Sequence, residues 1–151
     1  MSCAIQVEGY QRLGDSLAAM KGDSSNAIPF VVRLLENPAS PVALPGMIDL
    51  YRHDCLHLLL GRGFSLHDEA FVVGFTMGND LRTKALHLAI FKFCSLRLYP
   101  RPYRFDRSHL PSFDEGLALG RKARLRNINR FDFRSCEHQP LCLLRERLGI
   151  G

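Results

Sequence analysis

The segment GMIDLYRHDCLHLLL, residues 46–60, is followed at once by Gly61-Arg62-Gly63. Its apolar residues recur at the three- and four-residue spacing of an α-helix, and glycine is the usual residue just after a helix ends. The sequence therefore predicts a helix over residues 46–60. Ser65, with Asp68 three residues later, has the pattern of a helix start, and the apolar spacing carries this second helix over residues 66–77.

The rest of the chain also shows helical spacing, and no alternating strand pattern persists for more than a few residues. Further helices are predicted at 5–20, 27–36, 81–99, 113–126 (begun by Ser112 with Glu115) and 140–148. The fold class is therefore all-α, a single compact domain of about six or seven helices spanning residues 1–151. The metal-binding motif described below is expected on two consecutive antiparallel helices.

Composition limits the class of protein. The chain has 151 residues, 46% hydrophobic and 23% charged, as is ordinary for one globular domain. No apolar run is long enough to cross a bilayer, and the first residues lack the features of a secretory signal or an organelle transit peptide. The cysteines are odd in number and never spaced C-x-x-C, which favours reduced thiols over disulfides or a zinc knuckle. These features predict a cytoplasmic location.

The chain is basic, with a formal net charge of +5. A cluster of positive side chains follows the predicted helix start at Ser112: Arg121, Lys122, Arg124 and Arg126. No signature of a DNA- or RNA-binding module accompanies it, so we predict no nucleic-acid partner. Anionic head groups at a membrane surface or a ligand phosphate would suit this cluster, and a solvated helix face is the simpler explanation for any one of its members.

The pattern His53-Asp54-x-x-His57-x11-Glu69 carries the strongest chemical signal. His53 and His57 are four residues apart, so both imidazoles project from one face of the predicted helix. Asp54 flanks the same edge. After the Gly61-Arg62-Gly63 turn the chain reverses, and Glu69 arrives in the first turn of the next helix.

Two imidazoles and two carboxylates suit zinc, and also iron or manganese. One of the carboxylates could orient a histidine rather than touch the metal. Each residue alone has an ordinary structural explanation, such as a core histidine or an acidic residue favoured at a helix start. The joint spacing is what predicts a divalent-metal site formed by His53, Asp54, His57 and Glu69.

These residues resemble a known family. Tyr51-Arg52-His53-Asp54-x-x-His57, then Gly61 and Glu69, is similar to the HDxxH-x11-E signature of the Coq4 family of ubiquinone-biosynthesis proteins. The ending Leu144-Arg-Glu-Arg-Leu-Gly-Ile150 resembles the family's C-terminal segment, as in its short prokaryotic members. The likeness covers residues from about 44 to the end, whereas residues 1–43 match poorly. The chain also has no tryptophan, which the family carries before its last helix.

The resemblance implies an all-helical protein that binds zinc at the motif and associates peripherally with membranes. It implies a role late in prenylquinone assembly, on polyprenylated aromatic intermediates. Family members have been viewed as enzymes that replace a ring carboxylate by a hydroxyl group, and as organisers of a biosynthetic complex. An isoprenoid or prenylquinone-like lipid, a membrane surface and a homo-oligomer or larger complex are therefore the expected partners.

An isoprenoid tail would need an apolar groove. Candidate lining residues at helical spacing are Phe71, Phe75, Ile90 and Phe91. The same spacing is typical of ordinary core positions, which is the competing interpretation.

Two other functions stay open on sequence alone. The first is a metal-dependent phosphohydrolase of the HD type, which shares the His53-Asp54 dipeptide but needs an earlier histidine that this chain lacks. The second is a non-catalytic lipid-binding or scaffold protein in which the metal only fixes two helices.

Overall fold

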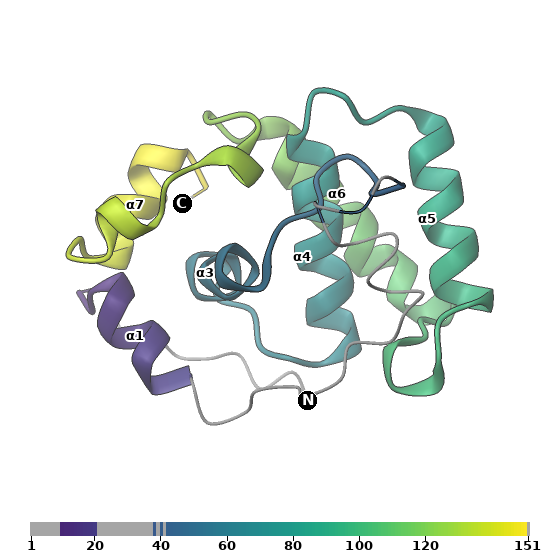
Figure 1. Cartoon of the computed structure of the whole chain (residues 1–151), viewed down its shortest axis with the longest axis horizontal. Coiled ribbons are helices and arrows are strands. Elements are labelled where there is room, and N and C mark those ends of the chain that lie inside the picture. Colours follow the sequence, from purple (N-terminus) through teal and green to yellow (C-terminus); the bar gives the residue numbers. More distant parts are fainter. Residues whose placement is uncertain (1–9, 21–37, 39, 41, 151) are drawn as a thin grey trace.

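The computed structural model describes residues 10–20, 38, 40 and 42–150. Within these residues the chain is all-helical, as predicted, and contains no strand; an isolated bridge joins Arg12 and Pro140. The α-helices in Figure 1 are α1 (Leu13–Met20), α3 (Leu50–Leu60), α4 (Leu66–Asn79), α5 (Ala85–Arg97), α6 (Leu110–Lys122) and α7 (Leu141–Leu148). Short 3-10 helices lie at Arg101–Tyr103, Arg107–His109, Ile128–Arg130 and Arg134–Cys136. No described helix is both long and apolar enough to cross a membrane.

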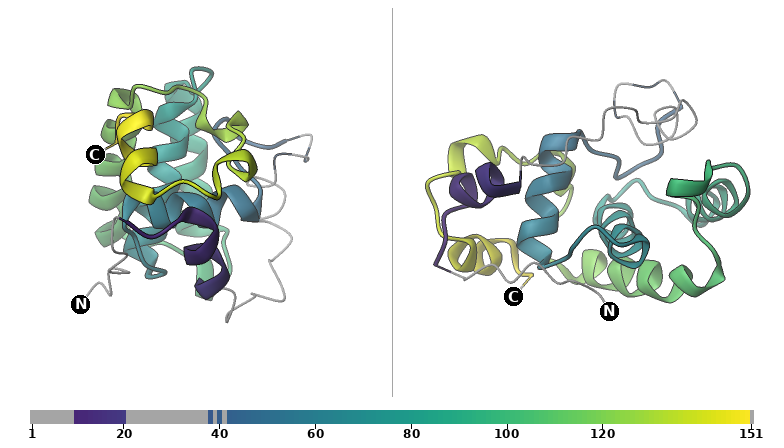
Figure 2. Two further views of the ribbon diagram at one scale, coloured as in Figure 1. Left: turned by 90° about the vertical axis from the view of Figure 1, so that its left-hand side faces the viewer. Right: turned by 90° about the horizontal axis from the view of Figure 1, so that it is seen from below.

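Helix α4 is the centre of the fold. Every residue from Ala70 to Asn79 is buried, which is the behaviour expected of a helix that is apolar on all sides. One face contributes Val72 and Phe75 to a core shared with α1, α3 and α7. The opposite face contributes Val73 and Met77 to a second core shared with α5 and α6. The two views of Figure 2 show these helices arranged on both sides of α4.

Among the described helices, α4 and α6 form the closest pair, and they meet through glycines. Gly74 and Gly78 of α4 face α6, and Gly116 and Gly120 of α6 face α4. A Cβ atom on Gly116 would lie 2.0 Å from the carbonyl oxygen of Phe71, and one on Gly120 would lie 2.1 Å from that of Phe75. The contacts advance together along both chains, so the helices are parallel. The absence of four side chains lets the two backbones touch.

The predicted helix over residues 46–60 begins later than expected. Asp49 is its N-cap, accepting a hydrogen bond from the Arg52 backbone N–H at 2.8 Å, and the helix starts at Leu50. Gly46 has a positive φ of 84° and its N–H donates to the Asp80 carboxylate at 2.8 Å. Residues 46–49 therefore form a loop tied to the end of α4, which their apolar spacing could not reveal.

Other boundaries differ for similar reasons. The predicted helix at 66–77 runs two residues further, and Ser65 caps it as predicted by accepting from the Asp68 backbone N–H at 3.1 Å. The helix predicted at 81–99 starts at Ala85, because residues 81–84 form a turn on Asp80. The helix predicted at 113–126 is shifted to 110–122, so Ser112 lies inside its first turn and does not cap it. The final helix is close to its predicted range.

Part of the N-terminal prediction cannot be compared with the structure. Of the helix predicted over 5–20, the structure describes residues 10–20, and helix begins there only at Leu13. The helix predicted at 27–36 lies outside the described residues.

The two helices of the metal motif cross instead of running antiparallel. In Figure 1, helix α3 is viewed along its axis, whereas α4 lies in the plane of the picture. Helix α6 packs along α4 through the glycines, whereas α3 shares only a few contacts with α4. The crossing still places the face of α3 that carries His53 and His57 against the first turn of α4, where Glu69 lies.

A buried asparagine fixes the C-terminal end of α4. The Asn79 side-chain amide donates to the carbonyls of Gly120 (3.2 Å) and Leu125 (2.7 Å), and its oxygen accepts from the Ile128 N–H at 2.7 Å. One side chain thereby anchors the segment that follows α6 to the central helix.

We expect Asn79→Ala to lower the free energy of unfolding by about 2–4 kcal/mol, because three buried backbone groups lose their partners. Urea denaturation measures the change. Asn129→Ala is the matched control, since its amide makes only a 3.4 Å contact with Asp80, and should cost less than about 1 kcal/mol. Equal losses in the two variants would contradict this role for Asn79.

Candidate metal centre

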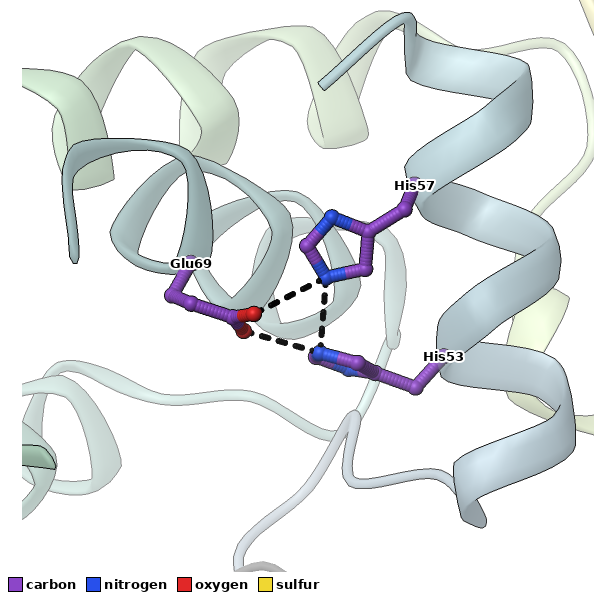
Figure 3. A group of neighbouring side chains, drawn as sticks. All are labelled: His53, His57 and Glu69. Carbon is purple, nitrogen blue, oxygen red and sulfur yellow. Dashed lines mark hydrogen bonds and ion pairs between the residues drawn. The ribbon is translucent and has the colours of Figure 1, made fainter. Parts of the chain in front are cut away.

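Three side chains from two helices converge on one point. His53 and His57 project from the same face of α3, and Glu69 reaches them from the first turn of α4 (Figure 3). The Nε2 atoms of the two histidines are 2.9 Å apart. Glu69 places Oε2 2.9 Å from His53 Nε2 and Oε1 3.2 Å from His57 Nε2. We call His53, His57 and Glu69 the metal triad.

The triad has the chemistry and spacing of a metal site. One ligand atom from each residue lies within 4.8 Å of the others, and within the described residues this is the single group of three or more histidine, cysteine or carboxylate side chains that could hold an ion. Zinc ligands at about 2.0 Å in tetrahedral geometry stand about 3.3 Å from one another. The observed separations are slightly shorter, so a small outward movement of the side chains would admit an ion.

The His57 ring is fully buried and has a defined orientation. Its Nδ1 faces the backbone carbonyl of Arg62 at 3.4 Å. A proton on Nδ1 would be donated to that carbonyl, leaving the Nε2 lone pair directed at the triad. Histidine ligands in metal proteins are commonly held in this way through their second ring nitrogen.

Without a metal, the triad is held by charge. Burial raises the pKa of the Glu69 carboxyl, but hydrogen bonds from His53 and His57 outweigh it and lower the pKa to about 2. Burial also disfavours protonated His57, yet its hydrogen bond to Glu69 and the carboxylate charge raise its pKa above the ordinary value. Glu69 is therefore ionised at neutral pH, and His57 keeps a proton to higher pH than a free histidine does.

These pKa shifts predict how metal affinity depends on pH. A metal ion must displace the proton from His57 to bind there. Because the pKa of His57 is raised, protons compete with the metal already at pH values above the ordinary histidine pKa of about 6.5. We expect the apparent affinity for zinc to fall steadily from pH 8 toward about pH 5.5, with Glu69 remaining ionised throughout. Titration against a chromophoric chelator at several pH values measures this. An affinity that stays constant over that range would contradict the assignment of His57 as a ligand.

Asp54 lies outside the triad, and its assignment as a fourth ligand stays a prediction. Each residue of an α-helix is rotated by about 100° from the one before, so the neighbour of His53 points to an adjacent face. Asp54 makes no hydrogen bond to either histidine within the described structure, although their charges lower its pKa. Burial and the charge of Glu69 prevail and raise the pKa of this half-buried carboxyl.

The turn between α3 and α4 determines where Glu69 meets the histidines. Gly61 ends α3 in the left-handed conformation (φ 63°), and Arg62 then folds over the Phe71 ring, 3.6 Å from its centroid. Arg62 also approaches the buried Asp68 at 3.8 Å. Both contacts tie the turn to the first residues of α4.

A residue from the C-terminal segment supports the end of α3. Arg145 donates hydrogen bonds to the carbonyls of Leu59 (2.8 Å) and Leu58 (2.9 Å). These are terminal carbonyls of the helix that carries both histidines, and a cation is favourable at that end. The C-terminal motif that contains Arg145 is visible in the sequence, whereas this contact is not, because it joins residues far apart in the chain.

Apolar side chains border the triad on its solvent side. Phe64 is 57% exposed, and its ring centroid lies 5.0 Å from that of His57. Leu50 is also exposed and shares a helical face with His53 and His57. His53 and Glu69 are themselves partly accessible, so the triad is open to solvent on this side.

The predicted lipid-lining residues are mostly core. Phe71, Phe75 and Phe91 are buried, and Phe91 stacks on Phe113 with ring centroids 5.3 Å apart. Ile90 is partly buried against the same cluster. None of the four lines either of two surface pockets, one at Arg124 and α7 and the other at Leu44 and Arg82. Core packing explains the helical spacing of these residues, and a lipid groove lined by them stays a prediction.

The predicted anionic-surface cluster divides into two kinds of residue. Arg121, Lys122 and Arg124 are exposed, as expected for a solvated or docking surface. Arg126 instead donates to the carbonyls of Gly78, Asn79 and Arg121, and so connects the ends of α4 and α6. Its guanidinium is engaged within the fold, which corrects its assignment to a ligand surface.

Comparisons with protein-family models, with curated proteins and with solved structures find no match to this chain.

Proposed function

We propose that this chain is a Coq4-like, metal-dependent protein of prenylquinone biosynthesis that binds a polyprenylated aromatic intermediate at the triad. The observation that carries the proposal is the convergence of His53, His57 and Glu69, whose spacing in the sequence is that of the Coq4 signature. Three protein ligands leave further coordination positions available, which is the arrangement of catalytic rather than purely structural metal sites.

The types of ligand atom limit which metals would bind. Two histidines and a carboxylate occur in catalytic zinc sites and also in iron(II) sites, so zinc and iron are the first candidates, with manganese next. Such an ion would polarise a ring carboxylate or phenolate oxygen brought to the site. Glu69 would supply a negatively charged oxygen ligand. His57 would supply a buried nitrogen ligand with a defined orientation, and His53 would supply a more exposed nitrogen ligand.

The surroundings suit an aromatic ligand with an apolar tail. Exposed Phe64 stands beside His57 and could stack on a ring whose carboxylate is directed at the triad. Exposed Leu50 extends the apolar border along α3. The proposed reaction class is removal of the ring carboxylate with replacement by hydroxyl, an oxidation that requires dioxygen or another oxidant as co-reactant.

The test compares ligands and products. Metal-loaded protein is mixed with a prenylated aromatic carboxylic acid under air, and binding, carbon dioxide release and the hydroxylated product are measured. We expect binding that is weakened by removing the prenyl tail and product formation that is lost in Glu69→Gln. Failure to bind any prenylated ring, by a protein shown to contain metal, would overturn the proposal.

A non-catalytic role is the second candidate, and one observation favours it. Two surface pockets, one at Arg124 and α7 and the other at Leu44 and Arg82, both lie away from the triad. In that case the same experiment would show lipid binding without carbon dioxide release. The HD phosphohydrolase alternative is weaker, because that family needs an earlier histidine and none precedes His53 in the sequence.

A further inference from the structure

The outer face of α5 is apolar and exposed. Leu86 is 68% exposed and Phe93 is 60% exposed, and they share a helical face with exposed Ala89. Leu81 and Leu98, which flank the helix, are also exposed. The opposite side of α5 packs into the core through Phe91 and Ser95. A helix at the surface usually presents polar residues to solvent, so this face lacks the polarity that its position predicts.

The charge of the same segment is strongly one-sided. Residues 81–105 contain six lysines and arginines and no aspartate or glutamate, a contribution of +6 within a chain whose net charge is +5. Lys84 precedes α5, whereas Arg97 ends it and Arg101 follows. These three exposed cations make no salt bridge with the described part of the chain. The apolar face is thus bounded by free positive charge at both ends.

The position of α5 makes this face accessible. In Figure 1 and in the right-hand view of Figure 2, α5 lies at an edge of the molecule, and no other described helix covers its outer side. Residues of α5 line neither of two surface pockets, one at Arg124 and α7 and the other at Leu44 and Arg82. An exposed apolar helix face with basic ends, at an edge of the molecule, fits a deformable, negatively charged plane better than it fits a rigid partner.

We propose that the outer face of α5 docks on an anionic lipid bilayer, with Leu86 and Phe93 entering the acyl region and Lys84, Arg97 and Arg101 meeting lipid phosphates. Pairing with a second copy of the chain is disfavoured, because a symmetric contact would place the two positive segments against each other. This docking surface is separate from Arg121, Lys122 and Arg124 on the far end of α6. It does not depend on the metal triad.

Vesicle sedimentation tests the proposal with the full chain. We expect binding to phosphatidylcholine vesicles that contain phosphatidylglycerol, weak binding to pure phosphatidylcholine, and loss of binding as salt rises from about 0.1 M to about 0.5 M. Leu86→Ser/Phe93→Ser should lower the partition coefficient at least about tenfold. Leu143→Ser, which changes an exposed leucine on α7, is the matched control and should have no effect. Treatment with a chelator should leave binding unchanged.

A charge-reversal pair separates the two basic surfaces. Arg97→Glu/Arg101→Glu should abolish binding, whereas Arg121→Glu/Lys122→Glu should not. Because the chain contains no tryptophan, Phe93→Trp provides a single fluorophore that should shift to shorter wavelength on anionic vesicles, and Leu143→Trp should not shift. Circular dichroism confirms that each variant is folded.

Three results would overturn the proposal. They are absence of binding by the folded wild-type chain, equal binding by Leu86→Ser/Phe93→Ser, and light scattering that shows a dimer dissociated by that double variant. The last result would identify a second copy as the occupant of the face.

Discussion

Gly116→Ala should lower the free energy of unfolding by about 3 kcal/mol or more, a large part of the 5–15 kcal/mol typical of a domain. Its Cβ would lie 2.0 Å from the Phe71 carbonyl oxygen and 2.8 Å from its carbonyl carbon, both backbone atoms in the central helix. Neither can rotate away, so α4 and α6 would have to separate along the whole glycine contact. The effect opposes the usual stabilising contribution of alanine in a helix, up to about 1 kcal/mol.

Gly14→Ala is the matched control for that prediction. Gly14 is also helical, but a Cβ there meets the Glu137 side chain at 3.2 Å and the Glu137 carbonyl oxygen at 3.3 Å, contacts that small shifts relieve. We expect a change within about 1 kcal/mol of zero. Urea denaturation of both variants measures the difference. A Gly116→Ala protein as stable as the wild type would contradict the backbone contact between α4 and α6.

Glu69→Gln should weaken metal binding at least about a hundredfold, and Asp54→Asn should weaken it less than about tenfold. Glutamine keeps the size of the side chain but removes the charge that faces both Nε2 atoms. Asparagine at position 54 changes a carboxylate that lies outside the triad and acts on it only through its field. Zinc affinities from competition titration at one pH measure the two effects.

Glu115→Gln controls for loss of one negative charge, because Glu115 is exposed on α6 and belongs to no metal-binding group. Its zinc affinity should equal that of the wild type. If Asp54→Asn proved as damaging as Glu69→Gln, the four-ligand site expected from the sequence would be restored and the three-residue triad would be wrong.

The sequence was sufficient where the controlling interactions are local. The apolar spacing around α3 and α4, the Ser65 cap and the Gly61 turn lie within a few residues of the features they determine. The pairing of His53 with His57 follows from helix geometry alone. Glu69 could be added because the intervening turn is short.

The sequence was insufficient where a distant contact decides the structure. The Asp80 carboxylate accepts a hydrogen bond from Gly46, so that residues 46–49 form a loop before α3 begins. The Arg126 guanidinium donates to a carbonyl at the end of α4 instead of facing solvent. The backbone contact between α4 and α6 joins glycines more than forty residues apart in the chain. The only sign of this contact in the sequence is the pair of patterns Gly74-x3-Gly78 and Gly116-x3-Gly120, which place small residues on one face of each helix.

The most direct test of the metal centre is elemental analysis of the purified chain and of His57→Ala, both prepared without added chelator or metal. The triad predicts about one zinc, iron or manganese ion per wild-type chain and almost none in the variant. Metal-free wild-type protein that takes up no ion on titration, together with unchanged stability of His57→Ala, would contradict the assignment of His53, His57 and Glu69 as a metal site.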